Sequence, residues 1–140
     1  MTLPRPELVL IEDDDVDVMA VRRALRKLSI TVPLHVHSDG VAALEWFKAR
    51  PPSAPPLIVL LDLNLPRMNG LEVLRALRAD PALKNLVVFV VTTSKAESDL
   101  RSAYDLNVAG YIVKSEIGRD FMQLVTLIEH YWRIVELPNA

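Results

Sequence analysis

Two short segments of this sequence, Leu57–Leu61 and Leu86–Val91, are apolar at every position. A strand with one face in water alternates apolar and polar residues, whereas a strand covered on both faces reads as a continuous apolar run. Both segments are therefore predicted to be central strands of a parallel sheet. Such a sheet forms only when helices cover both of its faces.

Segments of strand type alternate with longer segments of helical period along the whole chain. The predicted strands are 8–11, 34–38, 57–61, 86–91 and 110–113. Helices are predicted at 16–28, at 41–50, around Leu71–Leu77, at 96–106, and from an N-cap at Asp120 to about 135. Five βα units without an internal linker or repeat predict one α/β domain, with a doubly wound five-stranded parallel sheet and five helices.

Charge and apolar run length exclude several classes of function. The net charge of −2 lacks the basic footprint of a nucleic-acid-binding domain. No apolar run approaches the roughly 18 residues of a membrane span, and the N-terminus lacks the features of a signal peptide. The absence of cysteine fits a reducing compartment. We therefore expect a cytoplasmic protein that binds neither nucleic acid nor membrane.

Polar residues follow four of the predicted strands at the point where each strand ends. They are Glu12 and Asp13, then Asp62, then Thr92, Thr93 and Ser94, and finally Lys114. The carboxyl ends of parallel strands meet at one edge of the sheet, where ligands of such folds bind. Carboxylates brought that close disfavour shared ionisation, and a bound cation relieves the conflict. The crowded acids therefore predict a Mg²⁺ site.

Each of these residues also has a purely structural interpretation. Asp14, Asp15 and Asp17 are best explained as acids that cap the first helix and favour its N-terminal dipole. Asp62 alone could accept hydrogen bonds from the turn that follows it, and Lys114 alone could be a solvated lysine. Taken with the hydroxyls at the end of the fourth strand, however, the set supplies what a phosphoryl group needs: an acceptor oxygen, a cation site, a hydroxyl and an ammonium.

On these residues the chain resembles the receiver domain of response regulators, the phosphoacceptor half of two-component signalling. The matching motifs are the acidic pair at 12–13, "DLNLPRMNG" at 62–70, "VTTS" at 91–94 and "YIVK" at 111–114. The segments "TTSKAESDL" and "IEHYWRIVELP" resemble more narrowly the single-domain regulators that partner phytochrome-type histidine kinases. The resemblance implies the flavodoxin-like strand order 2-1-3-4-5.

The resemblance also implies the roles of the site residues. Asp62 would accept a phosphoryl group from a kinase phosphohistidine, and Lys114 and Thr92 would contact its oxygens. Asp13 would bind Mg²⁺ directly and Glu12 through water. Asp62 and the backbone carbonyl of Asn64 would complete the protein ligands. The protein is thus expected to be a signalling phosphoacceptor, one that catalyses its own phosphorylation and slow dephosphorylation, rather than an enzyme.

The resemblance implies a conformational switch as well. Thr92 would move toward the phosphoryl group, and Tyr111, expected at the surface before phosphorylation, would then turn inward. Asn64 and Ser94 occupy positions that tune the lifetime of the phosphoryl group. The family usually has proline after the lysine, whereas this chain has Ser115. We predict a trans Lys114–Ser115 bond, because a cis bond before a residue other than proline costs about 2.5–4 kcal/mol, and a reshaped loop before the last helix.

The end of the chain predicts an interface. Residues 7–130 are expected to form the receiver core and 131–140 an extension that serves as a dimerisation arm. Tyr131, Trp132, Ile134 and Leu137 are expected to form an exposed apolar end, and such patches mark interfaces. A homodimer is therefore predicted. No second domain follows Ala140, so the output is expected to pass through an unidentified partner protein.

Two other functions compete with this interpretation. A receiver-like binding module that is never phosphorylated would lack the acceptor, an acid or the lysine, and none is missing. A haloacid-dehalogenase-type phosphatase needs a second aspartate two residues after the nucleophile, where this chain has Asn64. His35 and His37 share one face of the second strand, and we expect them to be half-solvated residues of an edge strand rather than a metal pair.

Overall fold

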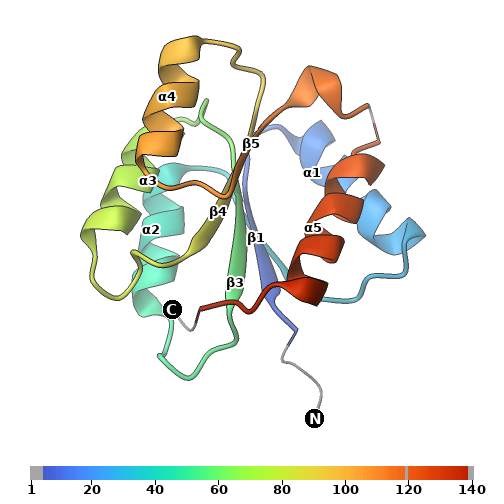
Figure 1. Ribbon diagram of the computed structural model, residues 1–140, viewed down its shortest axis with the longest axis horizontal. Helices are drawn as coiled ribbons and strands as arrows, with labels where there is room; N and C mark the ends of the chain where they lie inside the picture. Colours follow the sequence, from blue (N-terminus) through green and yellow to red (C-terminus); the bar gives the residue numbers. More distant parts are fainter. Residues whose placement is uncertain (1–4, 119, 139–140) are drawn as a thin grey trace.

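The computed structural model describes residues 5–118 and 120–138 and shows a parallel sheet between two layers of helices (Figure 1). Its strand order is β2-β1-β3-β4-β5. The elements are β1 (Glu7–Ile11), α1 (Asp15–Lys27), β2 (Leu34–His37), α2 (Gly40–Ala49), β3 (Leu57–Leu61), α3 (Gly70–Ala79), β4 (Val87–Thr92), α4 (Glu97–Asp105), β5 (Gly110–Val113), the 3₁₀ turn η1 (Lys114–Glu116) and α5 (Met122–Ile134). The predicted fold class, strand order and elements are confirmed.

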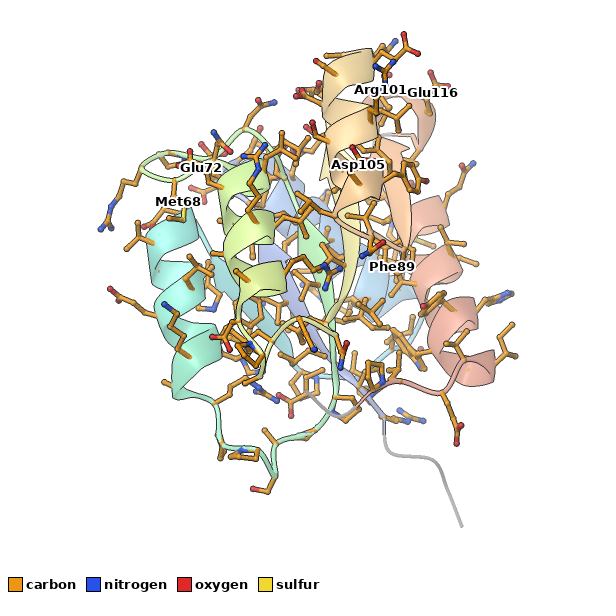
Figure 2. The ribbon with its side chains drawn as sticks, turned by 60° about the vertical axis from the view of Figure 1, so that its left-hand side comes forward. Met68, Glu72, Phe89, Arg101, Asp105 and Glu116 are labelled. Atoms are coloured by element: carbon orange, nitrogen blue, oxygen red, sulfur yellow. The ribbon has the colours of Figure 1, made fainter. Side chains whose placement is uncertain are left out.

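The two faces of the sheet bury separate apolar clusters. Val59 and Leu61 of β3 point into the cluster beneath α2, α3 and α4, whereas Ile58 and Leu60 point into the cluster beneath α1 and α5. Figure 2 brings the first of these faces forward, with Glu72 at the start of α3 and Arg101 and Asp105 on α4. Both faces of β3 are covered, as its continuous apolar run predicted. No helix in the described residues is long and apolar enough to cross a membrane.

The first three helices begin at capping side chains. The Asp14 carboxylate accepts a hydrogen bond from the Val16 N–H (2.9 Å), and Asp39 accepts one from Ala42 (2.8 Å). Asn69 forms a reciprocal capping box at the start of α3. The prediction that Asp120 caps the last helix is wrong. Phe121 is the N-cap of α5 and lies in the left-handed region with φ 56°, and the Asp120 carboxylate accepts a hydrogen bond from the Met122 N–H (3.2 Å).

Gly70 fixes the chain just after β3. A Cβ at this position would lie 2.3 Å from the backbone oxygen of Asp62, so no larger residue fits. The Gly70 N–H donates to the Leu63 carbonyl (2.9 Å). Because of this close approach, α3 begins directly against the end of β3, and the turn after Asp62 is held in one conformation.

The C-terminal segment differs from its prediction. Tyr131, Trp132 and Leu137 are partly buried against the cluster beneath α1 and α5, and Tyr131 meets the edge of the Phe89 ring at a centroid distance of 5.1 Å. Ile134, by contrast, is 85% exposed. The expectation of an exposed apolar end is thus wrong for three of its four residues. After α5 the chain turns back toward the sheet (Figure 1), and Leu137 packs against the cluster beneath α1 and α5.

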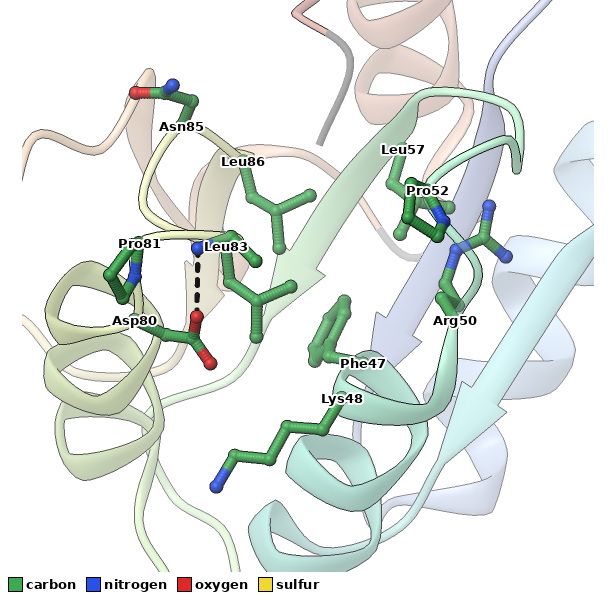
Figure 3. Close-up of a pocket in the computed structure, with 11 residues that line it drawn as sticks. Phe47, Lys48, Arg50, Pro52, Leu57, Asp80, Pro81, Leu83, Asn85 and Leu86 are labelled. Carbon is green, nitrogen blue, oxygen red and sulfur yellow. Dashed lines mark hydrogen bonds between the residues drawn. The ribbon is translucent and has the colours of Figure 1, made fainter.

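A cavity of about 320 Å³ lies at the amino end of the sheet, between the end of α2 and the loop after α3 (Figure 3). Phe47, Leu57, Leu83 and Leu86 form its apolar wall. The Asp80 carboxylate beside it accepts a hydrogen bond from the Ala82 N–H (2.9 Å). The polar residues singled out from the sequence lie at the opposite end of the strands, so this cavity is separate from them.

Candidate functional site

Three carboxylates converge at the carboxyl ends of β1 and β3. These strands are direct neighbours, with Ile11 in register with Leu61. The residues that follow, Glu12 and Asp62, are 3% and 5% exposed, whereas Asp13 is exposed. Oxygens of Glu12, Asp13 and Asp62 lie within 4.8 Å of one another. The predicted acid cluster therefore forms.

Lys114 extends from the end of β5 into this cluster. Its ammonium donates to Glu12 Oε1 (2.6 Å), to Asp17 Oδ2 (2.7 Å) and to Asp62 Oδ2 (3.1 Å). Its side chain is only 11% exposed. The interpretation of Lys114 as a solvated lysine is thus excluded, and so is a purely capping role for Asp17. The contact of Lys114 with Asp17 was not predicted from the sequence.

A signal for Asp17 was nevertheless present in the sequence. Residues four and seven positions further along α1 are Val21 and Ala24, and both are buried. Residues at this spacing share one face of a helix. An acid on the stripe that faces the sheet is unusual, and it could have been assigned to the site on that ground.

The charges in the site shift two pKa values. Burial raises the pKa of the Glu12 carboxyl to about 7; the hydrogen bond from Lys114 opposes this rise and the Asp62 carboxylate adds to it. Burial alone would lower the pKa of the Lys114 ammonium, but hydrogen bonds to Asp17 and Glu12 and the charge of Asp62 outweigh it, so this pKa is raised. Lys114 therefore stays protonated, and Glu12 holds its proton more tightly than an ordinary glutamate.

Asp62 is held by backbone and side-chain contacts. Its N–H donates to the Ile11 carbonyl (3.0 Å), and its Oδ1 accepts from the Asn64 N–H (3.1 Å). The carboxylate thus does accept a hydrogen bond from the turn, as the structural interpretation supposed, while its second oxygen faces Lys114. Asn64 is exposed, and its amide donates to the Thr93 hydroxyl (3.3 Å), which links the turn after β3 to the end of β4.

The hydroxyl residues at the end of β4 and in the loop that follows differ in their surroundings. Thr92 is completely buried, and its Oγ1 accepts from the Ser94 N–H (3.3 Å). Ser94 is half-buried, and its hydroxyl donates to Asp99 of α4 (2.6 Å). The loop after β4 is therefore tied to both the strand and the helix that it joins.

Tyr111 lies on β5 next to this loop. It packs against the cluster beneath α2, α3 and α4, and its hydroxyl donates to the Ser94 carbonyl (3.0 Å). Burial raises the pKa of this hydroxyl. The expectation of a surface tyrosine is wrong, because the ring packs against this cluster and the loop before α4 holds its hydroxyl. After β5 the Lys114–Ser115 bond is trans, as predicted, and the chain forms the turn η1 before α5.

The two histidines of β2 are not part of the acid cluster, although the His37 carbonyl accepts a hydrogen bond from the Glu12 N–H (2.9 Å). Both are half-buried on this edge strand, and their rings contact Trp46 at centroid distances of 4.7 Å (His35) and 5.2 Å (His37). His35 also bonds Glu7 through Nε2 (2.7 Å). The expectation of half-solvated residues on an edge strand is confirmed.

The acid cluster fits a hard divalent cation. Its donors are carboxylate oxygens alone, and two of the three side chains are buried, so their mutual repulsion is poorly screened. Hard dications prefer oxygen ligands and are commonly bound through carboxylates. The residues at this edge of the sheet are thus suited to a divalent metal.

Comparison with known proteins identifies the family. Residues 8–126 match the model of the response regulator receiver domain. The chain belongs to the response-regulator receiver family. It is 36% identical over 141 residues to response regulator Rcp1 of Synechocystis, an alignment that covers 98% of this chain and 96% of Rcp1.

Solved structures of receivers agree with the fold. The Mn²⁺-bound form of Rcp1 superposes with a TM-score of 0.83 at 36% identity, covering 96% of this chain and 99% of that one. The phosphorylated cyanobacterial phytochrome response regulator RcpA has a TM-score of 0.84 at 33% identity, with the same coverage. The likeness to the receiver family, and more narrowly to phytochrome response regulators, is confirmed.

Proposed function

We propose that this receiver takes a phosphoryl group from the phosphohistidine of a histidine kinase onto Asp62. The P–N bond breaks, its electron pair stays on the histidine nitrogen, and a P–O bond forms to a carboxylate oxygen of Asp62. The observation that carries this proposal is the convergence of Glu12, Asp13, Asp62 and Lys114 at one edge of the sheet. The structure of the phosphorylated relative RcpA also supports it.

We further propose that the resident cation is Mg²⁺. Asp13 and Asp62 would hold it directly, Glu12 through water, and Asn64 through its backbone carbonyl. When bound, Mg²⁺ neutralises charge on the phosphoryl oxygens and helps align the transfer. The chain's own part is to fix the acceptor on a rigid strand end. Lys114 stands 3.1 Å from Asp62 and supplies an ammonium to the phosphoryl oxygens.

Thr92 and Tyr111 are proposed to transmit the phosphorylated state. The buried Thr92 hydroxyl lies at the end of β4, next to β3, and would donate to a phosphoryl oxygen. A movement of Thr92 toward the phosphoryl group would disturb two hydrogen bonds of Ser94. One runs from the Ser94 N–H to the Thr92 hydroxyl, and the other from the Tyr111 hydroxyl to the Ser94 carbonyl. The loop between β4 and α4 is thus the element that phosphorylation reshapes. Asn64 and Ser94 are proposed to set how fast water removes the phosphoryl group.

The surface beside the site supports a protein partner. Val16 and Met19 of α1 are 73% and 56% exposed, close in sequence to the acid pair. Exposed apolar groups beside a reactive site are suited to docking. This surface supports the proposal that a kinase, of phytochrome type by resemblance, delivers the phosphoryl group.

Labelling with a small phosphodonor tests this function. Acetyl phosphate with Mg²⁺ is expected to phosphorylate the protein, and the product should appear as a mass increase in intact-protein mass spectrometry. Asp62→Asn should abolish the product, whereas Asp80→Asn, which changes an acid at the far end of the sheet, should not. Persistent labelling of Asp62→Asn would refute the assignment.

We also propose a homodimer through the C-terminal segment of residues 131–140. The exposed Ile134 is its best-supported contact, with Tyr131, Trp132 and Leu137 shaping the surface around it. Sedimentation should show a dimer that Ile134→Asp weakens. Val16→Asp, which changes an exposed apolar residue at the start of α1 rather than on α5, is the matched control. A monomeric protein at all concentrations would contradict the proposal.

A further inference from the structure

One acceptor of the Lys114 ammonium lies outside the acid cluster. Glu12 and Asp62 belong both to the cluster and to the partners of Lys114, whereas Asp17 is a partner of Lys114 alone. Asp17 comes from the first turn of α1, and its Oδ2 lies 2.7 Å from Nζ. The contact joins α1 to the end of β5, two elements far apart in the sequence.

The ammonium has three protons, and the structure gives each one an acceptor. Two of these acceptors are oxygens of residues that are also suited to a dication. A dication on Glu12 and Asp62 would repel the ammonium and draw on the same negative charge, so it would weaken the attraction of these two carboxylates for Lys114. Among the acceptors of Lys114 in the described residues, Asp17 is the one that lies outside the cluster, so a cation bound there does not compete for it.

We propose that Asp17 is a positioning residue that holds the Lys114 ammonium beside Asp62 while Glu12 and Asp62 are engaged by the cation and the phosphoryl group. This inference rests on the proposed phosphorylation of Asp62. Without Asp17, Lys114 would have only Glu12 and Asp62 as acceptors and would oppose the cation directly. With Asp17 it keeps a fixed partner and still reaches the acceptor residue.

The location of Asp17 suits this role. Its side chain is 22% exposed, so its contact with Lys114 is only partly screened by water. Its backbone belongs to a helix that Val21 and Ala24 anchor in the core. Asp15 lies in the same helical turn and carries the same charge, but it is exposed and does not bond Lys114. Both acids favour the helix dipole, and only Asp17 positions the lysine.

The difference between these two acids gives the test. Mg²⁺ binding to the purified protein is measured by titration calorimetry. Asp17→Asn is expected to weaken the affinity about tenfold, the usual size of an effect from a group that orients a site residue. Asp15→Asn removes the same formal charge and is expected to change it by about twofold or less, because an exposed charge is screened. Equal losses in the two variants would overturn the inference.

A double-variant cycle checks that the effect passes through Lys114. In the Lys114→Ala background, Asp17→Asn should weaken Mg²⁺ binding no more than Asp15→Asn does. An undiminished tenfold loss in that background would overturn the inference, because Asp17 would then act without the lysine. Asparagine is nearly the same size as aspartate, and urea unfolding monitored by tryptophan fluorescence verifies that each variant is folded.

Phosphorylation by acetyl phosphate separates this inference from the proposed function. If the unsubstituted protein is labelled at Asp62 while Asp17→Asn and Asp15→Asn are labelled at the same rate, Asp17 has no positioning role and the function stands. If the unsubstituted protein is not labelled at all, the function fails. At saturating Mg²⁺, Asp17→Asn is expected to be labelled about tenfold more slowly than Asp15→Asn.

Discussion

The two ends of the sheet both pair cations with acids, but in opposite proportions. At the carboxyl end one ammonium, Lys114, serves Glu12, Asp17 and Asp62, with Asp13 close by. At the amino end one carboxylate, Glu7, has two basic neighbours: its Oε1 lies 2.7 Å from His35 Nε2 and 3.6 Å from Arg50 Nη1. Acids are thus in excess at one end, and potential cations at the other.

This difference distinguishes charged residues that stabilise the fold from charged residues that form a reactive site. A carboxylate whose charge is already balanced by basic neighbours has no need of a bound cation. The contacts of Glu7 with His35 and Arg50 are therefore explained by the fold alone. Four carboxylates around one lysine repel one another, which the fold alone does not require. The surplus of negative charge around the buried Glu12 and Asp62 is relieved either by a proton on Glu12 or by an additional cation. It marks the end of the sheet at which that cation and a phosphoryl group would bind.

The largest expected effect is on phosphorylation. Lys114→Ala should slow labelling by acetyl phosphate about 100-fold, because it removes a charged donor aimed at the reacting oxygens. Arg50→Ala, which removes a cation from the amino end, should leave the rate unchanged. Rates come from the time course of phosphoprotein in mass spectrometry. Equal reductions of the labelling rate in the two variants would contradict the proposed difference between the two ends of the sheet.

The second prediction concerns stabilisation by Mg²⁺. At a concentration one hundred times its dissociation constant, the ion should raise the free energy of unfolding by about 2.7 kcal/mol, since it binds the folded chain. Asp13→Asn should remove most of this gain, whereas Glu7→Gln should keep it. Urea unfolding with and without Mg²⁺ measures both. If Mg²⁺ raised the free energy of unfolding of Asp13→Asn as much as that of the unsubstituted protein, the ion would bind at a site without Asp13.

The third prediction is a pH dependence of Mg²⁺ affinity. Burial raises the pKa of Glu12 to about 7, so below that pH a proton occupies a carboxyl group that the cation needs deprotonated. Affinity should therefore rise with pH up to about 7 and then level off, with a change of about tenfold per pH unit below it if one proton leaves. Calorimetry at several pH values tests this. In Glu12→Gln the Mg²⁺ affinity should change much less with pH. If it changed as steeply as in the unsubstituted protein, a group other than Glu12 would be responsible for the pH dependence.

Local patterns predicted most of the fold and most of the site. The apolar runs identified the buried strands because a strand covered on both faces tolerates no polar residue, and the polar residues directly after Ile11, Leu61 and Val113 marked the strand ends. Asp17 was missed because an acid in the first turn of a helix already has a sufficient local explanation. Its contact with Lys114 joins residues 97 positions apart, which helical periodicity alone does not show.

The errors at Tyr111 and in the C-terminal segment share one physical cause. How far a side chain on an edge strand or in a terminal segment is buried depends on which elements fold over it, not on its own pattern. Tyr111 is covered by the loop before α4, whose Ser94 carbonyl it binds. Tyr131 reaches back to Phe89 on β4. Neither covering contact is encoded in residues adjacent to the tyrosine.

The smallest expected effect concerns the amino end itself. Glu7→Gln should lower the free energy of unfolding by about 1 kcal/mol, because its carboxylate is only 19% exposed and serves two neighbours. Glu97→Gln is the matched control. Glu97 pairs with Arg101 on the surface of α4, and both side chains are mostly exposed, so its loss should be near zero. Urea unfolding distinguishes the two. If Glu7→Gln lowered the free energy of unfolding by several kcal/mol, the amino end would also depend on a strongly desolvated carboxylate. The two ends would then differ in the excess of acids at the carboxyl end, not in how strongly each depends on a buried charge.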